Sequence, residues 1–211
     1  MTTVIVSTCV CGSLSKETVL CPDHHRYFRE GREFASVSRV LRSVWPVKPD
    51  YSKAPADVLE NARLRGVEVD ALFSAYVAGA LKRIPAGTRA DAVKLFMRLR
   101  EWWDETHADH AASSQVILAD DDIAGTCDVI IGGGVWDLKA TYDVDDSYPL
   151  QVGMYGLLYA AMYGRPPDAL GIIHVTERYA TPKVISLPVE ETMRDAALIR
   201  DTWRMAQRRI G

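Results

Sequence analysis

The stretch Val116–Lys139, which reads VILADDDIAGTCDVIIGGGVWDLK, decides the fold of this chain. It contains three short apolar runs that are separated by an aspartate triplet and a glycine triplet. Runs of this length that are rich in Val and Ile and bounded by Asp and Gly predict the strands of an antiparallel meander. The predicted strands are Gln115–Leu118, Thr126–Ile131 and Val135–Ala140.

Charged residues within these apolar strands are candidates for a metal site. Asp137 and Lys139 are two positions apart, so they share one face of their strand. Asp128, on the preceding strand, can lie beside them. Carboxylate oxygens suit Mg²⁺, and a lysine on the same face can orient the attacking water or stabilise developing charge. The backbone carbonyl of Leu138 is a candidate for a third ligand, and the side chain of Asp70, from a helix packed across the sheet, is a candidate to complete the shell. The plain alternative for Asp70 is a solvated helix residue.

The composition describes an ordinary globular chain. With 211 residues the chain is long enough for one domain with a sizeable core and a small appendage. A hydrophobic content of 48% and a charged content of 25% are typical of soluble proteins. No apolar run approaches the roughly 18 residues of a membrane span, and the N-terminus lacks a secretion signal. We therefore expect no membrane association and a cytoplasmic protein. The net charge of −3 neither indicates nor excludes a nucleic-acid partner, because local basic clusters matter more than the sum.

Helical periodicity and turn signals divide the rest of the chain. Ser36 or Ser38 is the expected N-cap of the first helix. The apolar spacing predicts five helices and two further strands. The helices are Arg39–Val44, Asp57–Ile84, Arg89–His110, Ser147–Tyr163 and Glu190–Ile210, and the strands are Ala169–Glu177 and Lys183–Leu187.

The N-terminal segment carries a second candidate metal site. Cys9, Cys11, Cys21 and His24 lie close together in the sequence, with His25 as a competing fourth ligand. Two closely spaced ligand pairs joined by a hairpin are typical of structural zinc. In the predicted hairpin, strand Val4–Val6 precedes the first pair and Thr18–Leu20 returns towards the second. The alternative is a set of incidental cysteines. We expect residues 1–30 to form this zinc hairpin and residues 31–211 to form the main domain.

Arginines and aromatic residues alternate after the candidate zinc ligands, between His25 and Trp45. This mixture could follow a nucleic-acid backbone. It could equally be an amphipathic connector with a solvated basic face, and the sequence leaves both interpretations open.

Three motifs in order give the chain a family resemblance. Gly125–Asp128 has the form G-x-x-D, Asp137–Lys139 has the form D-x-K, and Gln151–Tyr155 has the form Q-x-x-x-Y. Together they resemble the RecB-like branch of the PD-(D/E)xK nucleases. Ser36–Leu41 resembles the first helix of that family, and Arg65-Gly66 with Asp70 resembles its R-G-x-x-x-H motif, with Asp in place of His.

The resemblance implies an α/β fold of the restriction-endonuclease type, in which helices flank a central mixed sheet that contains the meander. It also implies a Mg²⁺- or Mn²⁺-dependent DNA nuclease that is similar to phage and CRISPR-associated exonucleases. Asp128 and Asp137 would bind the metal, Lys139 would activate water, and Gln151 and Tyr155 would contact DNA or brace the site. Some of those relatives hold an iron–sulfur cluster with late cysteines. No cysteine follows Cys127 here, which argues against such a cluster.

The resemblance further implies a role in DNA recombination or repair on linear duplex or single-stranded DNA, with a possible recombination partner protein. For a phage-encoded protein the location would be the host cytoplasm. Two alternatives remain open. One is an inactive nuclease fold that binds nucleic acid or docks a partner, and the other is an endonuclease of the restriction or junction-resolving type.

Overall fold

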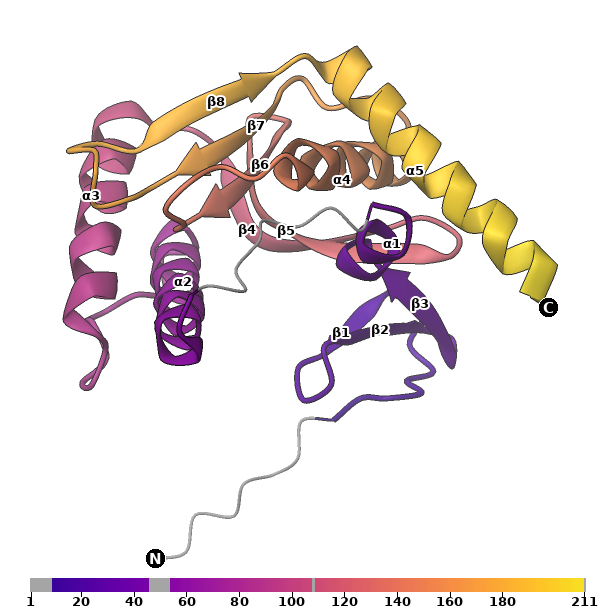
Figure 1. The fold of residues 1–211 in the computed structure, drawn as a ribbon, viewed down its shortest axis with the longest axis horizontal. Helices are drawn as coiled ribbons and strands as arrows, with labels where there is room; N and C mark the ends of the chain where they lie inside the picture. The colour runs from indigo at the N-terminus through magenta and orange to yellow at the C-terminus, as the bar shows by residue number, and fades with distance from the viewer. Residues whose placement is uncertain (1–8, 46–53, 108, 211) are drawn as a thin grey trace, which may run out of the picture.

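An eight-stranded mixed sheet with helices on both faces forms the body of the protein (Figure 1). The computed structural model describes residues 9–45, 54–107 and 109–210. Within them the strands are β1 Val19–Cys21, β2 Arg26–Arg29, β3 Arg32–Ser36, β4 Ala112–Ala119, β5 Ile123–Ile131, β6 Gly134–Lys139, β7 Leu170–His174 and β8 Lys183–Leu187. The helices are α1 Val37–Val44, α2 Ala56–Val77, α3 Ala90–Thr106, α4 Ser147–Tyr163 and α5 Val189–Ile210. The α/β fold with a central mixed sheet is as the sequence predicts.

The meander of β4, β5 and β6 is the centre of the sheet. β5 pairs antiparallel with β4 along one edge and with β6 along the other. The β5–β6 turn is Gly132-Gly133, and both glycines have positive φ, at 54° and 89°. Turns with positive φ at both central residues match the twist of a hairpin, and glycine adopts them without strain. Beyond β6 the sheet continues with parallel β7 and antiparallel β8.

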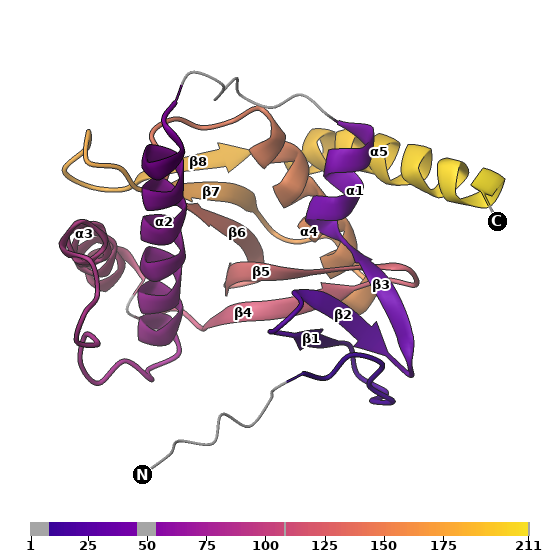
Figure 2. The same cartoon turned by 60° about the horizontal axis from the view of Figure 1, so that its bottom comes forward.

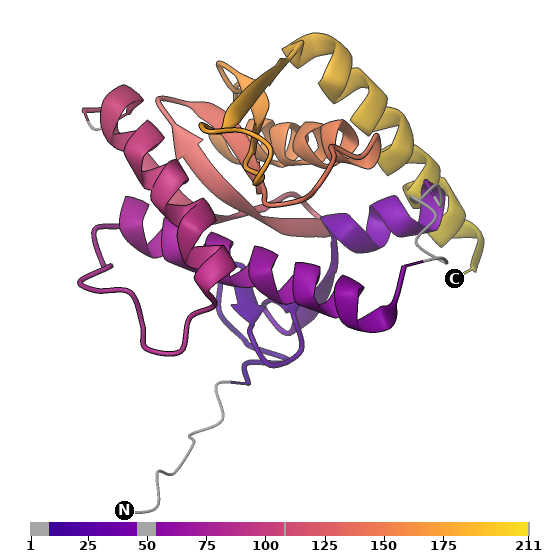
Figure 3. The same cartoon turned by 60° about the vertical axis from the view of Figure 1, so that its left-hand side comes forward.

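Two hydrophobic cores cover the two faces of the sheet. Helices α1, α4 and α5 pack over one face, and α2 and α3 pack over the other. The turned views show these two helical layers on opposite sides of the strands (Figures 2 and 3). Buried α4 residues such as Met154 and Leu158 lie in the first core, and buried α3 residues such as Phe96 and Leu99 lie in the second. The sheet is therefore a middle layer that helices from both sides can reach.

The N-terminal strands β1, β2 and β3 continue the main sheet. β1 pairs with β2, β2 pairs with β3, and β3 runs parallel to the start of β5 through Ala35↔Ile123 and Ser36↔Ala124. The predicted return strand Thr18–Leu20 corresponds to β1, although its partner is β2. The predicted strand Val4–Val6 lies outside the described residues. The proposed domain boundary between residues 30 and 31 falls in the β2–β3 turn.

Predicted helix ends differ from the structure most clearly in α2 and α3. α3 ends at Thr106 and not at His110. α2 ends at Val77 and not at Ile84, because Gly79 with φ of 65° turns the chain away from the helix. The N-cap position of α2 is Pro55, and no side chain caps this helix. Ser36 does cap α1, accepting a hydrogen bond from the Arg39 amide at 3.2 Å. The helix that matters most for the site, α4, has the predicted bounds.

Candidate active site and metal centres

Asp128 lies where the hydrogen-bonded ladder of β5 is broken on both edges. Towards β4, the pairs on either side of it are Val116↔Cys127 and Ser114↔Val129, and no pair forms at Asp128 itself. Towards β6, the ladder stops at Val129↔Trp136. Further along this edge β5 pairs again with β3, at Ala124. Residues 125–128 therefore face a gap between β3 and β6 in which side chains can meet.

The gap brings Asp128 next to Asp137. The Asp128 carboxylate accepts a hydrogen bond from the Leu138 amide at 2.7 Å, in place of a ladder bond. Asp137, adjacent to Leu138 on β6, is 1% exposed. The sequence-predicted pair of carboxylates is thus assembled by one side chain that bridges two strands.

A chain of polar contacts runs from Asp137 to α4. Lys139 Nζ lies 2.6 Å from Asp137 Oδ2 and donates a hydrogen bond to Gln151 Oε1 at 3.1 Å. Gln151 Nε2 in turn donates to the Tyr155 hydroxyl at 3.0 Å. Nζ also lies 4.8 Å from the centre of the Tyr148 ring. Helix α4 therefore fixes the lysine ammonium, and one network joins four of the five predicted catalytic residues, Asp137, Lys139, Gln151 and Tyr155.

Asp70 approaches the carboxylate pair from α2, on the other side of the sheet. Its oxygens accept hydrogen bonds from Gln115 Nε2 at 3.1 and 3.2 Å and from the Ser74 hydroxyl at 3.3 Å. Gln115 lies on β4 with φ of 52°, a left-handed conformation that is uncommon outside glycine. Such residues occur where surrounding contacts hold them, often at functional sites. Sequence reasoning did not identify Gln115, because its contact with Asp70 spans 45 positions.

Three carboxylates, those of Asp70, Asp128 and Asp137, lie close enough to influence one another's ionisation. Burial, followed by the charges of Asp137 and Asp70, raises the pKa of Asp128 well above its usual value. Burial also raises the pKa of Asp70, with a smaller contribution from Asp137. For Lys139, burial alone would lower the pKa, but Asp137 and Asp128 outweigh it and raise the pKa. The lysine is thus a protonated ammonium beside carboxylates that need a further positive charge.

These residues fit a divalent metal. Asp137 Oδ2 is buried and, apart from the nearby Lys139 ammonium, has no hydrogen-bond partner. A hard cation would take this oxygen together with an oxygen of Asp128, and it would relieve the repulsion between them. The ligand role of Asp70, which lies on the α2 side, stays a prediction. The Leu138 amide is engaged with Asp128, and the ligand role of the Leu138 carbonyl stays a prediction.

The N-terminal cysteines and one histidine form a compact ligand set. The ligand atoms of Cys9, Cys11, Cys21 and His24 all lie within 4.8 Å of one another, and no other described residues give a set of three or more so closely grouped. His24 Nδ1 lies 3.5, 3.3 and 3.5 Å from the three sulfurs. Ligands about 2.3 Å from a tetrahedral zinc are separated by about 3.7 Å, so the spacing matches. Of the two candidate histidines, His24 is the one in the set.

The candidate zinc site is connected to the strand of Asp128. Cys21 ends β1, and Tyr27 on the paired strand β2 is 2% exposed. The Tyr27 hydroxyl lies 2.9 Å from Thr126 Oγ1, inside the gap along β5. Desolvation would raise the pKa of Cys21, but the hydrogen bond from His24 and further hydrogen bonds lower it to about 6. Desolvation and the hydrogen bonds with Cys21 and Cys9 raise the pKa of Cys11 to about 12, so zinc binding has to displace the proton of that thiol. Tyr27 is a second residue that the sequence did not single out.

The arginine and aromatic stretch between His25 and Trp45 forms β2, β3 and α1. The Arg29 and Arg32 guanidinium groups lie 4.7 and 5.5 Å from the centre of the Phe34 ring. Arg29 also donates to the Asp120 carbonyl at 3.0 Å. At least these arginines therefore contribute to packing of the N-terminal strands.

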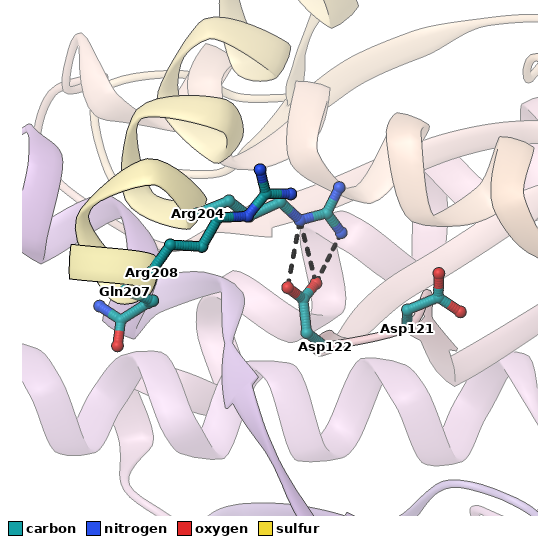
Figure 4. Close-up of a pocket in the computed structure, with 5 residues that line it drawn as sticks. All are labelled: Asp121, Asp122, Arg204, Gln207 and Arg208. Carbon is teal, nitrogen blue, oxygen red and sulfur yellow. Dashed lines mark hydrogen bonds and ion pairs between the residues drawn. The ribbon is translucent and has the colours of Figure 1, made fainter. Parts of the chain in front are cut away.

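The aspartate triplet that precedes β5 forms a turn and is not part of the active site. Asp120 Oδ1 accepts hydrogen bonds from the amides of Asp122 and Ile123. Arg204 on α5 pairs with both Asp120 and Asp122 at 2.6 Å. Figure 4 shows the Arg204 pair with Asp122, while Asp121 lies apart on the same turn. The ion pairs fasten α5 to the end of the β4–β5 hairpin.

Comparison with known proteins supports the fold. No protein-family model and no curated protein sequence matches the chain. Among solved structures, a "putative exonuclease" from Eubacterium rectale matches with a TM-score of 0.54 and 17% identity over 84% of this chain and 79% of that one. An alkaline exonuclease from Laribacter hongkongensis aligns with a TM-score of 0.41 and 11% identity over 84% of this chain and 91% of that one.

Within the described residues no helix is long and apolar enough to cross a membrane. By the first of these matches, this chain has the fold of the Eubacterium rectale protein.

Proposed function

We propose that this protein is a metal-dependent DNA nuclease that hydrolyses phosphodiester bonds, with Asp128 and Asp137 holding Mg²⁺ or Mn²⁺. One observation carries the proposal. Two aspartates meet at a break in the sheet, beside a lysine whose ammonium is held by one of them and by α4. The shared fold with a protein that is described as an exonuclease agrees with this function.

When bound, the metal would polarise the phosphate and lower the pKa of the attacking water. The protein's own contribution is positioning and charge. Lys139 is protonated, so it offers N–H donors and no acceptor. It would therefore orient the water and stabilise negative charge that develops on the phosphate. Gln151 accepts from Lys139 and donates to Tyr155, which keeps the ammonium in place.

We further propose that Asp70 and the Leu138 carbonyl complete the metal shell. Gln115 and Ser74 hold the Asp70 carboxylate on the α2 side of the gap. An aspartate in place of the family's histidine adds a negative charge, which favours a hard cation such as Mg²⁺ or Mn²⁺.

At the N-terminus we propose a structural zinc on Cys9, Cys11, Cys21 and His24, because four ligands leave no open position for chemistry. We also propose action on DNA ends in recombination or repair, a possible recombination partner protein, and a cytoplasmic location, which would be the host cytoplasm if a phage encodes the protein. These proposals extend the sequence resemblance.

The test is cleavage of end-labelled linear duplex and single-stranded DNA with Mn²⁺ or Mg²⁺. Asp137→Asn and Lys139→Met should abolish cleavage while leaving the fold intact by circular dichroism. Resistance of circular DNA would identify an exonuclease, and cutting of circles would identify an endonuclease. Equal cleavage by the wild type and by Asp137→Asn would disprove the proposal. Absence of cleavage by the wild type on every form of DNA would instead favour the inactive nucleic-acid-binding or docking module.

A further inference from the structure

A cavity of about 700 Å³ lies between the first half of α2 and the loop from β6 to α4. Ala140 lines it directly after Lys139, and Asp146 lines it directly before the first residue of α4. On the other side, Arg65 lines it from the same helix that carries Asp70. The cavity therefore adjoins the candidate active site through both of its walls. A volume of this size suits roughly one or two nucleotides and is too small for a duplex.

Arg65 has an unsatisfied hydrogen-bond donor beside this cavity, which a ligand could satisfy. Its Nε is buried and has no hydrogen-bond partner. Among the described residues no carboxylate forms an ion pair with it, whereas its neighbour Arg63 is paired with Glu60 at 2.7 Å. A buried, unpaired donor is unfavourable unless a ligand satisfies it. A phosphate would do so, because the guanidinium fork matches its oxygens.

The opposite wall carries an aromatic ring. Tyr142 is 66% exposed, and the Arg178 guanidinium covers it at 3.3 Å from the ring centre. Arg178 also pairs with Asp143 at 2.8 Å, which neutralises that carboxylate and fixes the arginine over the ring. The tyrosine is thus braced on one side, and with 66% of its surface exposed it lines the cavity with ring surface that a base could contact. Bases stack on such rings irrespective of sequence.

The remaining lining is consistent with a nucleotide. Val58, Ala62 and Ala140 give apolar walls for the flat face of a base. Asp145 and Asp146 line the cavity from the loop, and carboxylates accept hydrogen bonds from amino groups of bases. Asp145 Oδ1 already accepts a hydrogen bond from the Ser147 amide at 2.8 Å, so Asp146 is the freer acceptor of the two. The cation on one wall and the acceptors on the other match the two ends of a nucleotide.

We propose that this cavity is a binding subsite for one or two nucleotides of a single DNA strand, with Arg65 on a phosphate and Tyr142 stacked on a base. The inference rests on the proposed nuclease function for its placement beside the scissile bond. It adds a substrate preference: a strand must be unpaired to enter.

The test measures binding without cleavage. Full-length protein with Asp137→Asn is titrated, in Ca²⁺, with a labelled single strand of about twelve nucleotides and with a blunt duplex of the same length. Arg65→Met keeps the aliphatic stem, Tyr142→Ala removes the ring, and Arg194→Met is the matched control, since Arg194 is 71% exposed on α5. Urea unfolding establishes that each variant is folded.

We expect Arg65→Met and Tyr142→Ala each to weaken single-strand binding roughly tenfold, and Arg194→Met to change it less than about twofold. Duplex binding should change little in all three. Arg65→Met should also reduce the salt dependence of single-strand binding by about 0.7 in logarithmic slope. Crosslinking of a 5-iodouracil strand to Tyr142, lost in Tyr142→Ala, would support the same contact.

Equal effects of Arg65→Met and Arg194→Met, or equal losses for single strand and duplex, would overturn the subsite. The two proposals fail separately. Single-strand binding that depends on Arg65 supports the subsite even if the wild type cleaves no DNA. Suppose that Arg65→Met in the Asp137→Asn background binds single strands as tightly as Asp137→Asn alone, and that Arg65→Met alone cleaves DNA normally. This result would overturn the subsite and leave the nuclease proposal standing.

Discussion

Gly125 is tightly packed beside the active site, and this packing predicts the effect of adding a single methyl group there. A Cβ at this position would lie 2.7 Å from Cε1 of Tyr155 and 2.8 Å from Cγ2 of Val37. Carbon atoms in contact are normally about 3.5–4.0 Å apart, so Gly125→Ala overlaps both neighbours by roughly 0.7 Å or more. Tyr155 is 6% exposed and Val37 is 1% exposed, so neither can move into solvent.

The magnitude follows from this overlap. Overpacking a tight core costs about 1–3 kcal/mol of unfolding free energy, and the site faces two rigid neighbours, so we expect a loss of about 2 kcal/mol. Displacement of the Tyr155 ring also moves Gln151 and, through it, Lys139. A misplacement near 1 Å at reacting groups lowers rates by about a hundredfold. We therefore expect DNA cleavage to fall about a hundredfold, well beyond the loss that unfolding alone would cause.

The assay combines urea unfolding with Mn²⁺-dependent cleavage at a temperature where the variant is folded. Gly66→Ala, in the middle of α2, is the matched control, because a Cβ added there would have no other atom within 4 Å. Its free energy of unfolding should rise by about 0.5–1 kcal/mol, because alanine favours the helix more than glycine does. Adding Val37→Ala to Gly125→Ala should restore part of the activity by making room for the methyl group. Wild-type stability and cleavage in Gly125→Ala would refute the packing argument.

Three further predictions follow from other parts of the structure. Burial and two neighbouring carboxylates raise the folded-state pKa of Asp128 above its unfolded value of about 3.9. As pH rises, the Asp128 side chain therefore loses its proton at a lower pH in the unfolded chain than in the folded protein. In buffer without Mg²⁺ or Mn²⁺ this group should therefore lower stability from about pH 4 upward, until the folded-state pKa is passed; urea unfolding across pH should show a weaker decline in Asp128→Asn. Metal analysis should find about one zinc per chain and its loss in Cys21→Ser; equal zinc in both would contradict the site. Arg204→Met should lose about 1–2 kcal/mol by detaching the Asp120–Asp122 turn, and Arg208→Met, which lines the same hollow, should change stability by less than about 0.5 kcal/mol.

The parts of the fold that the sequence predicted well are those with a strong local signal. The bounds of α4 and β8 agree with prediction to the residue, and the meander is correct because Gly132-Gly133 allows only a tight turn. The β2–β3 hairpin was missed although a signal was present: Glu30-Gly31 has positive φ at both residues and is flanked by aromatic residues. Because arginines occupy several positions of β2 and β3, the alternation of apolar and polar residues that predicts a strand is hard to see in the sequence.

The candidate site was only partly predictable. The spacing of Asp137 and Lys139 places both on one face, and the helical spacing of Gln151 and Tyr155 does the same on α4, so local geometry was sufficient. The contact of Asp70 with Gln115 joins a helix to a strand across the sheet, and it depends on an unusual backbone conformation at Gln115. No spacing rule reports such a contact, because it arises from packing of distant segments.

The break in the ladder around Asp128 has a consequence for the motions of the metal-free protein. Asp128 lacks a ladder pair on both edges of its strand, although Cys127 and Val129 beside it are paired with β4, so its backbone is held less firmly than theirs. Amide protons near Asp128 should therefore exchange with solvent faster than those at the paired ends of β5, in openings that need no global unfolding. A cation that joins Asp128 to Asp137 would close this weak point. Hydrogen exchange should then slow at the centre of β5 when Mn²⁺ is added. Binding of the catalytic metal would in this way also stabilise the centre of the sheet.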